Sequence, residues 1–138
     1  MTQLRTEEKL PDKRAVFTDL DGTLLNSQQL LTSANRDTLN ALGKAGIQRI
    51  VVTGRSLFSA RRVMDMEFPI DLLVTSSGAC IFNFPALDIL YSAVLSKQQV
   101  RRAVVCLKQL RLDFMIHAPL PNNHLFGWYR NSSSNEDF

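Results

Sequence analysis

Three short apolar segments, each ending at small polar residues, constrain the fold of this chain more than any other feature. They are residues 14–19, 47–52 and 72–75. Such runs are typical of strands that are buried in a parallel sheet. Because helical patterns lie between them, the sequence predicts right-handed βαβ units and an α/β fold, with a Rossmann-like parallel sheet and helices on both of its faces.

Start and stop signals bound the two helices between these strands. The first helix is predicted to follow an N-cap at Thr32 or Ser33 and to end before Gly46. The second is predicted from about residue 56 to residue 67, because apolar residues recur on one side and Pro69 follows shortly afterwards.

The pattern changes after Gly78. The elements expected there are a β-hairpin (79–82 and 89–94), a helix capped by Ser96 (96–110) and two short strands (112–117 and 125–129). The polar residues before position 14 are expected to form a mobile segment, and the Ser/Asn-rich tail after residue 130 is expected to be linker-like or frayed.

Length and composition exclude several classes of protein. At 138 residues the chain fits one domain with a hydrophobic core. Its 45% hydrophobic and 21% charged content is ordinary for a soluble protein. No apolar run approaches the roughly 20 residues that a membrane helix needs, and the polar N-terminus is unlike a secretory signal. We therefore expect a cytoplasmic protein that does not bind a membrane.

The net charge of +3 comes from scattered basic residues. The pairs Arg61-Arg62 and Arg101-Arg102 lie in helical segments without interleaved aromatic residues, which indicates solvated helix faces and no nucleic-acid partner. A mild positive balance favours a small anionic substrate.

Two carboxylates stand at the end of the first predicted strand. Asp19 and Asp21 are followed at once by Gly22 and Thr23. Residues i and i+2 share one face of a strand, but a strand that ends beside a glycine can aim the two acids separately. This arrangement can mount a nucleophile and its proton-transfer partner on one rigid element, so the spacing indicates chemistry rather than packing.

Polar groups also follow the second and third predicted strands, at residues 53–55 and 76–78. In open parallel sheets, ligands bind outside the carboxyl ends of the strands, so we expect these groups to converge with the two acids. Thr53 supplies a hydroxyl, and Gly54 lets backbone N–H groups approach an anion next to a helix N-terminus, which favours a phosphate. A carboxylate pair beside a phosphate calls for a divalent cation, and Mg²⁺ fits best.

The segment Asp19-Leu20-Asp21-Gly22-Thr23, taken with Thr53-Gly54-Arg55, resembles the first and second motifs of the haloacid dehalogenase (HAD) superfamily. The Leu24-Leu25 extension and the strand at 78–81 are similar to the Cof-type, subtype IIB phosphatases. This resemblance covers residues 14–82. It implies the N-terminal part of a HAD-like core (14–95) and a partial cap domain (96–138), preceded by the segment expected to be mobile (1–13).

The resemblance implies a role for each site residue. Asp19 would attack phosphorus and form an aspartyl-phosphate, while Asp21 would protonate the leaving oxygen and then activate water. The Asp19 carboxylate and the Asp21 backbone carbonyl would also hold Mg²⁺. Thr53 and the Gly54 amide would bind the phosphoryl group, and Arg55 would contribute to that substrate-binding turn or orient it. The chemistry of these residue types supports the same roles independently.

Two further HAD motifs cannot be placed in this sequence. Lys97 and Lys108 lie in the helix predicted after the hairpin, where solvated positions are expected, and no Gly-Asp pair follows Arg55. Ser77-Gly78 stands where relatives commonly have Asn-Gly. We therefore expect the N-terminal part of a longer hydrolase, or a truncated gene product, with an exposed sheet edge that favours homo-oligomers.

The two cysteines, the two histidines and three aromatic residues near the C-terminus are expected to have structural roles. Cys80 and Cys106 are expected to be reduced and largely buried thiols, with no disulfide. His117 and His124 have no acidic or Cys partner nearby, so a metal site is not expected there. The aromatic residues Phe126, Trp128 and Tyr129 are expected in a strand or a core, with a substrate-specificity surface as the other interpretation.

Three functions remain open on the sequence. The leading hypothesis is a magnesium-dependent phosphatase that acts on sugar phosphates or similar small metabolites. The second is a catalytically inactive remnant that binds phosphate or a partner protein. The third is a phosphomutase on the same scaffold, which would return the phosphoryl group to a sugar.

Overall fold

The computed structural model describes residues 14–131. The predicted mobile segment, residues 1–13, lies outside this range, as does the tail from residue 132 onward. Within residues 14–131 no helix is both long enough and apolar enough to cross a membrane.

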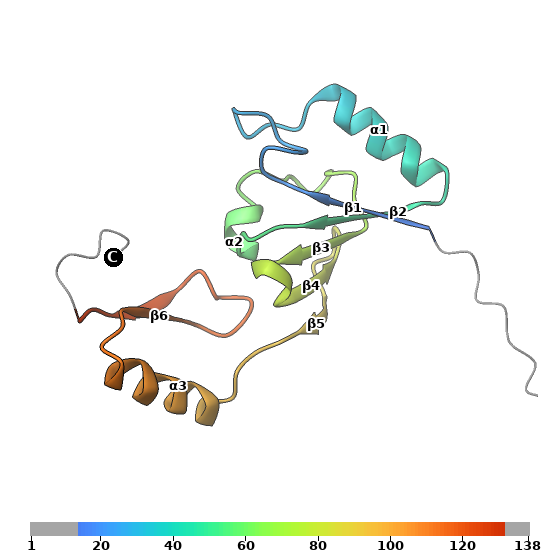
Figure 1. Cartoon of the computed structure of the whole chain (residues 1–138). Helices are drawn as coiled ribbons and strands as arrows, with labels where there is room; N and C mark the ends of the chain where they lie inside the picture. Colours follow the sequence, from blue (N-terminus) through green and yellow to red (C-terminus); the bar gives the residue numbers. More distant parts are fainter. Residues whose placement is uncertain (1–13, 132–138) are drawn as a thin grey trace, which may run out of the picture.

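The larger of two sheets has five strands in the order β1-β2-β3-β4-β5 (Figure 1). These strands are β1 (Ala15–Asp19), β2 (Gln48–Val52), β3 (Leu72–Thr75), β4 (Cys80–Asn83) and β5 (Ile89–Ser92). The first three are parallel, and β4 and β5 extend the sheet as an antiparallel hairpin. The predicted α/β fold with a Rossmann-like sheet is confirmed, and the hairpin predicted after Gly78 forms part of the same sheet.

The register of the parallel strands brings their carboxyl ends to one edge. Asp19 lies beside Val52, and Val52 lies beside Val74. The polar residues that follow each strand therefore begin at the same level of the sheet, as the sequence predicted.

The first helix follows its predicted boundaries. Helix α1 (Ser33–Lys44) begins after Thr32, whose hydroxyl accepts a hydrogen bond from the backbone N–H of Asn35 at 3.2 Å. Beyond its end Gly46 takes a φ of +69°, and the amide of Ile47 donates to the carbonyl of Leu42 at 3.0 Å. A left-handed glycine with this backbone bond closes the C-terminus of the helix.

The second helix is much shorter than predicted. Helix α2 covers only Leu57–Ala60, whereas the apolar pattern predicted a helix to residue 67. The Asp65 side chain accepts a hydrogen bond from the amide of Glu67 at 3.0 Å, which offers the backbone an alternative to the helix. Pro69 in addition disfavours helical angles at the residue before it.

A helix and a two-stranded antiparallel sheet follow the larger sheet. They are α3 (Lys97–Gln109), β6 (Phe114–His117) and β7 (Phe126–Tyr129). Ser96 and Gln99 form a reciprocal capping box at the start of α3, as expected from the Ser96 cap. The five-stranded sheet ends before residue 95 and α3 begins after it, but the division of the chain into core and cap stays a prediction.

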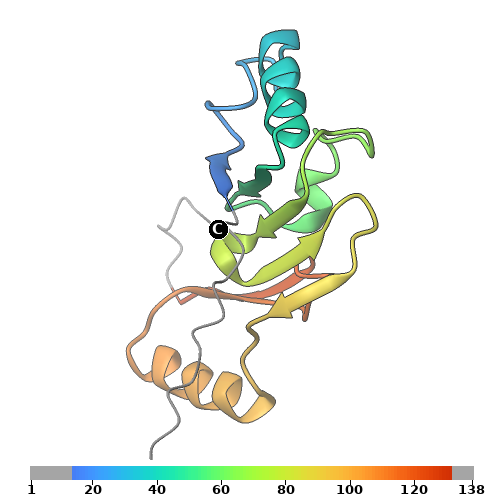
Figure 2. The same cartoon turned by 90° about the vertical axis from the view of Figure 1, so that its right-hand side faces the viewer.

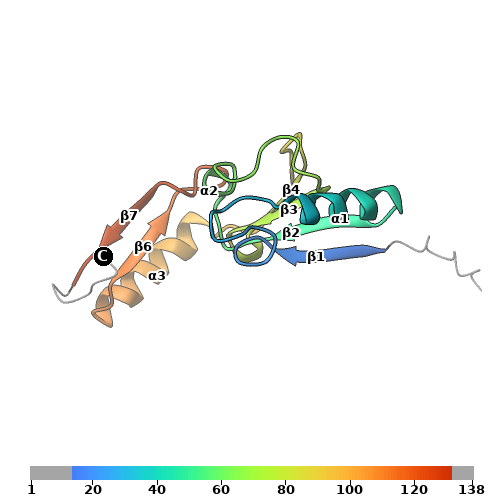
Figure 3. The same ribbon diagram turned by 90° about the horizontal axis from the view of Figure 1, so that it is seen from above.

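Helix α3 and the β6–β7 hairpin lie away from α1, beyond the carboxyl ends of the parallel strands (Figures 1 and 3). Figure 2 shows the same separation from the side, with α3 farthest from α1.

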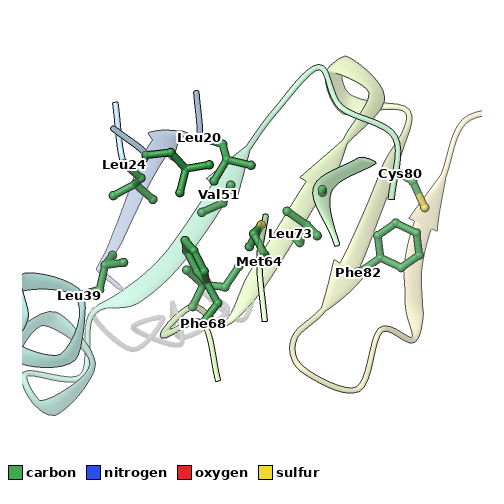
Figure 4. Close-up of a cluster of buried hydrophobic side chains, with 12 residues drawn as sticks. Leu20, Leu24, Leu39, Val51, Met64, Phe68, Leu73, Cys80 and Phe82 are labelled. Carbon is green, nitrogen blue, oxygen red and sulfur yellow. The ribbon is translucent and has the colours of Figure 1, made fainter. Parts of the chain in front are cut away.

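The core lies on one face of the five-stranded sheet (Figure 4). Val51, Leu73 and Phe82 occupy paired positions on neighbouring strands and are at most 1% exposed. Leu39 of α1 and Ala60 of α2 belong to the same cluster, so both helices cover this face. The expected helices on both faces are thus not found among residues 14–131, and Phe17 on the opposite face is 67% exposed.

An ion pair joins β2 to the beginning of β3. The guanidinium of Arg49 donates to both carboxylate oxygens of Asp71, at 3.0 and 2.7 Å, and its backbone N–H donates to the same carboxylate at 2.7 Å. The Arg49 guanidinium holds the pKa of the Asp71 carboxyl below its ordinary value. These bonds fix the relative position of two strands whose far ends carry the candidate site.

Candidate active site

Asp19 and Asp21 point outward on either side of a buried residue. Asp19 ends β1 and is exposed, Leu20 is fully buried, and Asp21 is exposed again. Leu20 also accepts a backbone hydrogen bond from Leu25 at 2.9 Å, and Gly22 takes a φ of +70°. The buried leucine and the left-handed glycine anchor the turn, so both carboxylates are held at the edge of the sheet.

The turn at residues 53–55 (the 53–55 turn) follows β2 directly. The Thr53 amide donates to the carbonyl of Val74 at 2.9 Å, and the Thr53 hydroxyl accepts from the Arg55 amide at 3.1 Å. Thr53 is only 3% exposed. Thr53 therefore shapes the turn with its oxygen, and its hydroxyl hydrogen can still be donated to a ligand.

The turn after β3 is hydrogen-bonded to the 53–55 turn. The amides of Ser76 and Ser77 donate to the carbonyls of Arg55 and Thr53, at 2.8 and 3.2 Å. Ser76, Ser77 and Gly78 have φ values of 52°, 54° and 98°, so three successive residues are left-handed. For the two serines this backbone is strained, and strain of this kind persists where surrounding contacts determine the conformation.

Gly54 lies open at the same place. A Cβ added to Gly54 would lie 3.7 Å from Ser77 Oγ, which is ordinary van der Waals contact. The backbone of the turn therefore has room on this side, and the amides of residues 54 and 55 are near a short helix that begins at Leu57.

Arg55 connects the 53–55 turn to the acid pair. Its guanidinium donates to both carboxylate oxygens of Asp21, at 2.8 and 2.7 Å, and to the carbonyl and hydroxyl oxygens of Ser59 at 3.3 and 3.2 Å. The hydrogen bonds from Arg55 lower the pKa of the Asp21 carboxyl below its ordinary value. The ends of β1, β2 and β3 are thus brought together as predicted. The Arg55–Asp21 ion pair joins the end of β1 to the turn after β2.

The Arg55–Asp21 ion pair was not predicted. The sequence placed Arg55 in the substrate-binding turn, and no signal in the sequence pairs it with an acid that is 34 positions away. The one available indication was their positions relative to the strands. Arg55 follows the second strand and Asp21 follows the first, and neighbouring parallel strands place such residues side by side.

The two carboxylates differ in their availability to a cation. Within residues 14–131 the Asp19 carboxylate has no hydrogen-bond or ion-pair partner, whereas Asp21 is engaged by Arg55. No group of three or more His, Cys, Asp or Glu side chains able to hold a metal occurs in the part of the chain that the structure describes. One available carboxylate and nearby backbone carbonyls fit Mg²⁺, which keeps several waters and binds through one or two carboxylates and substrate phosphate.

The loop between β6 and β7 reaches the site, which the sequence did not predict. Asn123 donates through Nδ2 to Ser76 Oγ at 2.7 Å, and the His124 ring stacks on Phe58 with centroids 4.3 Å apart. A cavity of about 540 Å³ lies between this loop, α2 and the strand-end turns, and Gly54 and Ser77 line one side of it.

The two cysteines and Lys108 were also candidate residues in the sequence. Cys80 is buried, and burial raises the pKa of its thiol, but Cys106 is exposed on α3, so the expectation of two buried thiols is wrong for Cys106. Both thiols are free, as expected. Lys108 lies over the Tyr129 ring, 4.7 Å from its centroid, and therefore does not reach the acid pair from that position.

Paired carboxylates at the carboxyl edge of a parallel sheet, beside a turn that can hold an anion, define a class of α/β enzymes that act on anionic groups. The sequence of residues 16–136 matches the haloacid dehalogenase-like hydrolase family. This chain belongs to that family, so the resemblance found in the motifs is confirmed.

Individual relatives are similar over part of their length. The 5-amino-6-(5-phospho-D-ribitylamino)uracil phosphatase YcsE of Bacillus subtilis is 31% identical over 72 residues, which are 52% of this chain and 29% of the relative. The structure of BT1666 from Bacteroides thetaiotaomicron, a phosphatase of the same superfamily, superposes with a TM-score of 0.71 at 18% identity. That match covers 96% of this chain and 48% of BT1666.

A second solved structure is the HAD subclass IIB sugar phosphatase BT4131. It superposes with a TM-score of 0.55 at 20% identity, over 84% of this chain and 44% of BT4131. At these identities the two structures establish the shared fold. The chain spans less than half the length of each of these relatives.

Proposed function

We propose that this chain carries part of the active site of a magnesium-dependent phosphomonoester hydrolase of the Cof type, subtype IIB. One observation carries the proposal: Asp19 and Asp21 converge with the 53–55 turn at the carboxyl edge of the sheet, where Arg55 binds Asp21 at 2.7 Å. Membership of the haloacid dehalogenase-like hydrolases supports the same chemistry.

In the proposed mechanism Asp19 is the nucleophile. Its carboxylate oxygen forms a bond to phosphorus while the bond from phosphorus to the leaving oxygen breaks, and Asp21 gives that oxygen its proton. Asp21 then takes a proton from water, which attacks phosphorus and releases inorganic phosphate and the Asp19 carboxylate. Asp19 suits the first role because its carboxylate is exposed and has no partner within residues 14–131.

The ion pair with Arg55 favours one of the two roles proposed for Asp21. Since Arg55 lowers the pKa of the Asp21 carboxyl, Asp21 is ionised in this arrangement, which is the form that activates water. Donation of a proton to the leaving oxygen requires that Asp21 be protonated first. An incoming phosphate that attracts the Arg55 guanidinium would weaken the ion pair and favour protonation.

Phosphoryl groups would bind at the 53–55 turn, through the Thr53 hydroxyl, the Gly54 amide and Arg55. Mg²⁺ would be held by the Asp19 carboxylate and the backbone carbonyl of Asp21, and it would neutralise phosphate charge there. The chain's own contribution is to hold these groups rigidly, because Leu20 and Thr53 are buried at the base of both turns.

The substrates we propose are sugar phosphates or similar small phosphorylated metabolites. Two relatives support this class by name: YcsE, whose substrate carries a phosphorylated ribityl chain, and the sugar phosphatase BT4131. We further propose that residues 14–95 are the core part and that residues 96–138 begin a cap domain. The position of the β6–β7 hairpin beyond the strand ends supports this division.

The experiment is to detect the aspartyl-phosphate. The longest natural protein that contains this chain is incubated with Mg²⁺ and p-nitrophenyl phosphate, and an acid-stable, hydroxylamine-labile adduct on Asp19 is sought by mass spectrometry. Asp19→Asn should abolish both adduct and turnover, while Asp88→Asn, in the distant β4–β5 turn, should leave both unchanged. Neither hydrolysis nor an adduct in the unmutated protein would refute the proposal.

A second function, a phosphate-binding or protein-interaction module, is favoured by one observation. Within residues 14–131 strand β1 is paired only with β2, and Phe17 on its outer face is 67% exposed. An unpaired edge with an exposed aromatic residue can pair with a second copy of the chain. Calorimetry with Mg²⁺ and beryllofluoride separates the functions. A module that only binds other proteins and has no phosphate site would give no heat of binding.

A further inference from the structure

The cavity next to the 53–55 turn is lined by two chemically different sets of residues. Its volume of about 540 Å³ suits a small organic ligand. One set includes Gly54, Ser56 and Ser77, which present backbone and hydroxyl groups. The other set is the rings of Phe58, His117, His124 and Phe126, which we call the aromatic surface.

The rings of the aromatic surface come from two segments that are far apart in the sequence. Phe58 of α2 stacks on His124 with centroids 4.3 Å apart and an interplanar angle of 13°. His117 of β6 packs on Phe126 of β7 at 5.4 Å and 46°. Phe58 and Phe126 remain 52% and 51% exposed, so both keep ring area that a ligand can contact.

Hydrogen bonds hold the aromatic surface at a fixed place relative to the phosphate-binding turns. Asn123 Nδ2 donates to Ser76 Oγ at 2.7 Å, and Ser76 is itself bonded through its amide to the Arg55 carbonyl at 2.8 Å. His117 Nδ1 donates to the Asn123 carbonyl at 2.7 Å. A ligand that contacts both the turns and the aromatic surface therefore does not have to order the loop when it binds.

We propose that the aromatic surface binds the leaving group of the phosphomonoester and selects, among small phosphorylated metabolites, those whose leaving group also presents a flat aromatic ring over plain sugar phosphates. This inference rests on the proposed function, which places the phosphoryl group next to Gly54, and it narrows the substrate class given there. A flat ring gains an offset-stacked or edge-to-face contact with Phe58, His124 or Phe126 that a puckered or acyclic group of the same size cannot make.

A second, larger groove of about 600 Å³ does not compete for this role. It lies between α3 and the residues after β5, and its lining includes the apolar side chains of Val100, Val104 and Leu107. None of the strand-end residues 53–55 lines it. A phosphate bound there would lack the groups that hold it in the proposed mechanism.

The test compares the binding of two phosphonates that cannot be hydrolysed as esters. Benzylphosphonate and cyclohexylmethylphosphonate have the same anion and nearly the same size, but only the first has a flat ring. Isothermal titration calorimetry of this chain with Mg²⁺ should give benzylphosphonate an affinity about fivefold higher, the value that one aromatic contact provides.

Three variants show whether the rings cause the preference. Phe58→Leu and Phe126→Leu each keep an apolar side chain, and the variant that removes the ring in contact with the ligand should reduce the affinity ratio to about one, with the affinity for inorganic phosphate unchanged. Trp128→Leu is the matched control, because Trp128 lies on the same strand as Phe126, is 63% exposed and does not line the cavity. This control should keep the fivefold preference.

Failure of the aromatic surface can be told apart from failure of the proposed function. Binding of inorganic phosphate without a preference between the phosphonates overturns the aromatic surface alone, as does a preference that survives both Leu variants. If inorganic phosphate does not bind, the proposed phosphate site is wrong. Benzyl alcohol and cyclohexylmethanol then test the aromatic surface by NMR titration, and equal affinities would overturn it.

Discussion

Replacement of Asp71 by asparagine tests whether the ion pair behind the active site stabilises the fold. Asp71 accepts three hydrogen bonds from Arg49, two from the guanidinium and one from the backbone amide. Asparagine has the same shape but no charge and one acceptor oxygen in place of two. The half-buried guanidinium of Arg49, whose side chain is 17% exposed, would lose its counter-charge.

The expected loss of stability is about 2 kcal/mol. A hydrogen bond to a charged group contributes about 1.5–3 kcal/mol, and Asp71→Asn weakens two such bonds without removing every acceptor. The sum is discounted because the Asp71 side chain is 37% exposed, so water replaces part of the interaction. For a domain of this size, about 2 kcal/mol lowers the Tm by about 8 °C.

The assay is urea unfolding followed by circular dichroism, repeated across the acidic range. Arg49 depresses the pKa of Asp71 in the folded state, so its contribution is present above the unfolded pKa and is lost as pH falls through the folded value. The difference between the unmutated protein and Asp71→Asn should therefore be constant near neutrality. It should shrink below about pH 4, where the carboxyl of the unfolded chain is protonated.

Asp65→Asn is the matched control. Asp65 pairs with Arg36 at 3.6 Å in an exposed geometry, and asparagine can still accept the bond from the Glu67 amide. Its expected cost is below about 0.5 kcal/mol. The reasoning is refuted if Asp71→Asn costs no more than Asp65→Asn, or if its effect is the same at pH 3 as at pH 7.

Four further predictions concern the site, the turns beside it and the thiols. Arg55→Ala should raise the pKa of the Asp21 carboxyl towards its ordinary value, seen as an upward shift of its ¹³C NMR titration midpoint; an unmoved midpoint would show that Arg55 is not the cause. Gly54→Ala should change the free energy of unfolding by less than about 0.5 kcal/mol, because its Cβ meets only ordinary contact, yet should weaken inorganic phosphate binding. Gly78→Ala, at a φ of +98°, should instead cost more than about 1 kcal/mol in urea unfolding. Cys106 should react with a thiol reagent within the mixing time of the folded protein and Cys80 only on unfolding, so two equally fast thiols would contradict the burial of Cys80.

The sequence predicted the parts of the fold that depend on local pattern. The three parallel strands, the hairpin after Gly78 and helices α1 and α3 lie where apolar periodicity and capping residues placed them. Their signals are local: Thr32 and Ser96 cap the helices with their own side chains, and Gly46 closes α1 with a left-handed backbone.

Predictions that rested on apolar character alone were less successful. The apolar pattern continues past Ala60, where helix α2 ends, because periodicity does not report competing local bonds such as the one from the Glu67 amide to the Asp65 side chain. The exposure of Cys106 was also missed, because the face of α3 that carries it has no neighbour within residues 14–131 that buries it. Burial is a property of the whole packing and cannot be assigned to one residue type.

For the candidate site, the chemical groups and their order along the chain could be predicted from the sequence. Asp19 and Asp21 at one strand end, and Thr53 and Gly54 at the next, must meet at one edge because neighbouring parallel strands end together. Which of these groups bind one another became visible only in the folded structure. Arg55 pairs with Asp21, and Asn123 brings an aromatic loop to Ser76, because contacts between segments far apart in sequence depend on strand register and loop path, which no local pattern encodes.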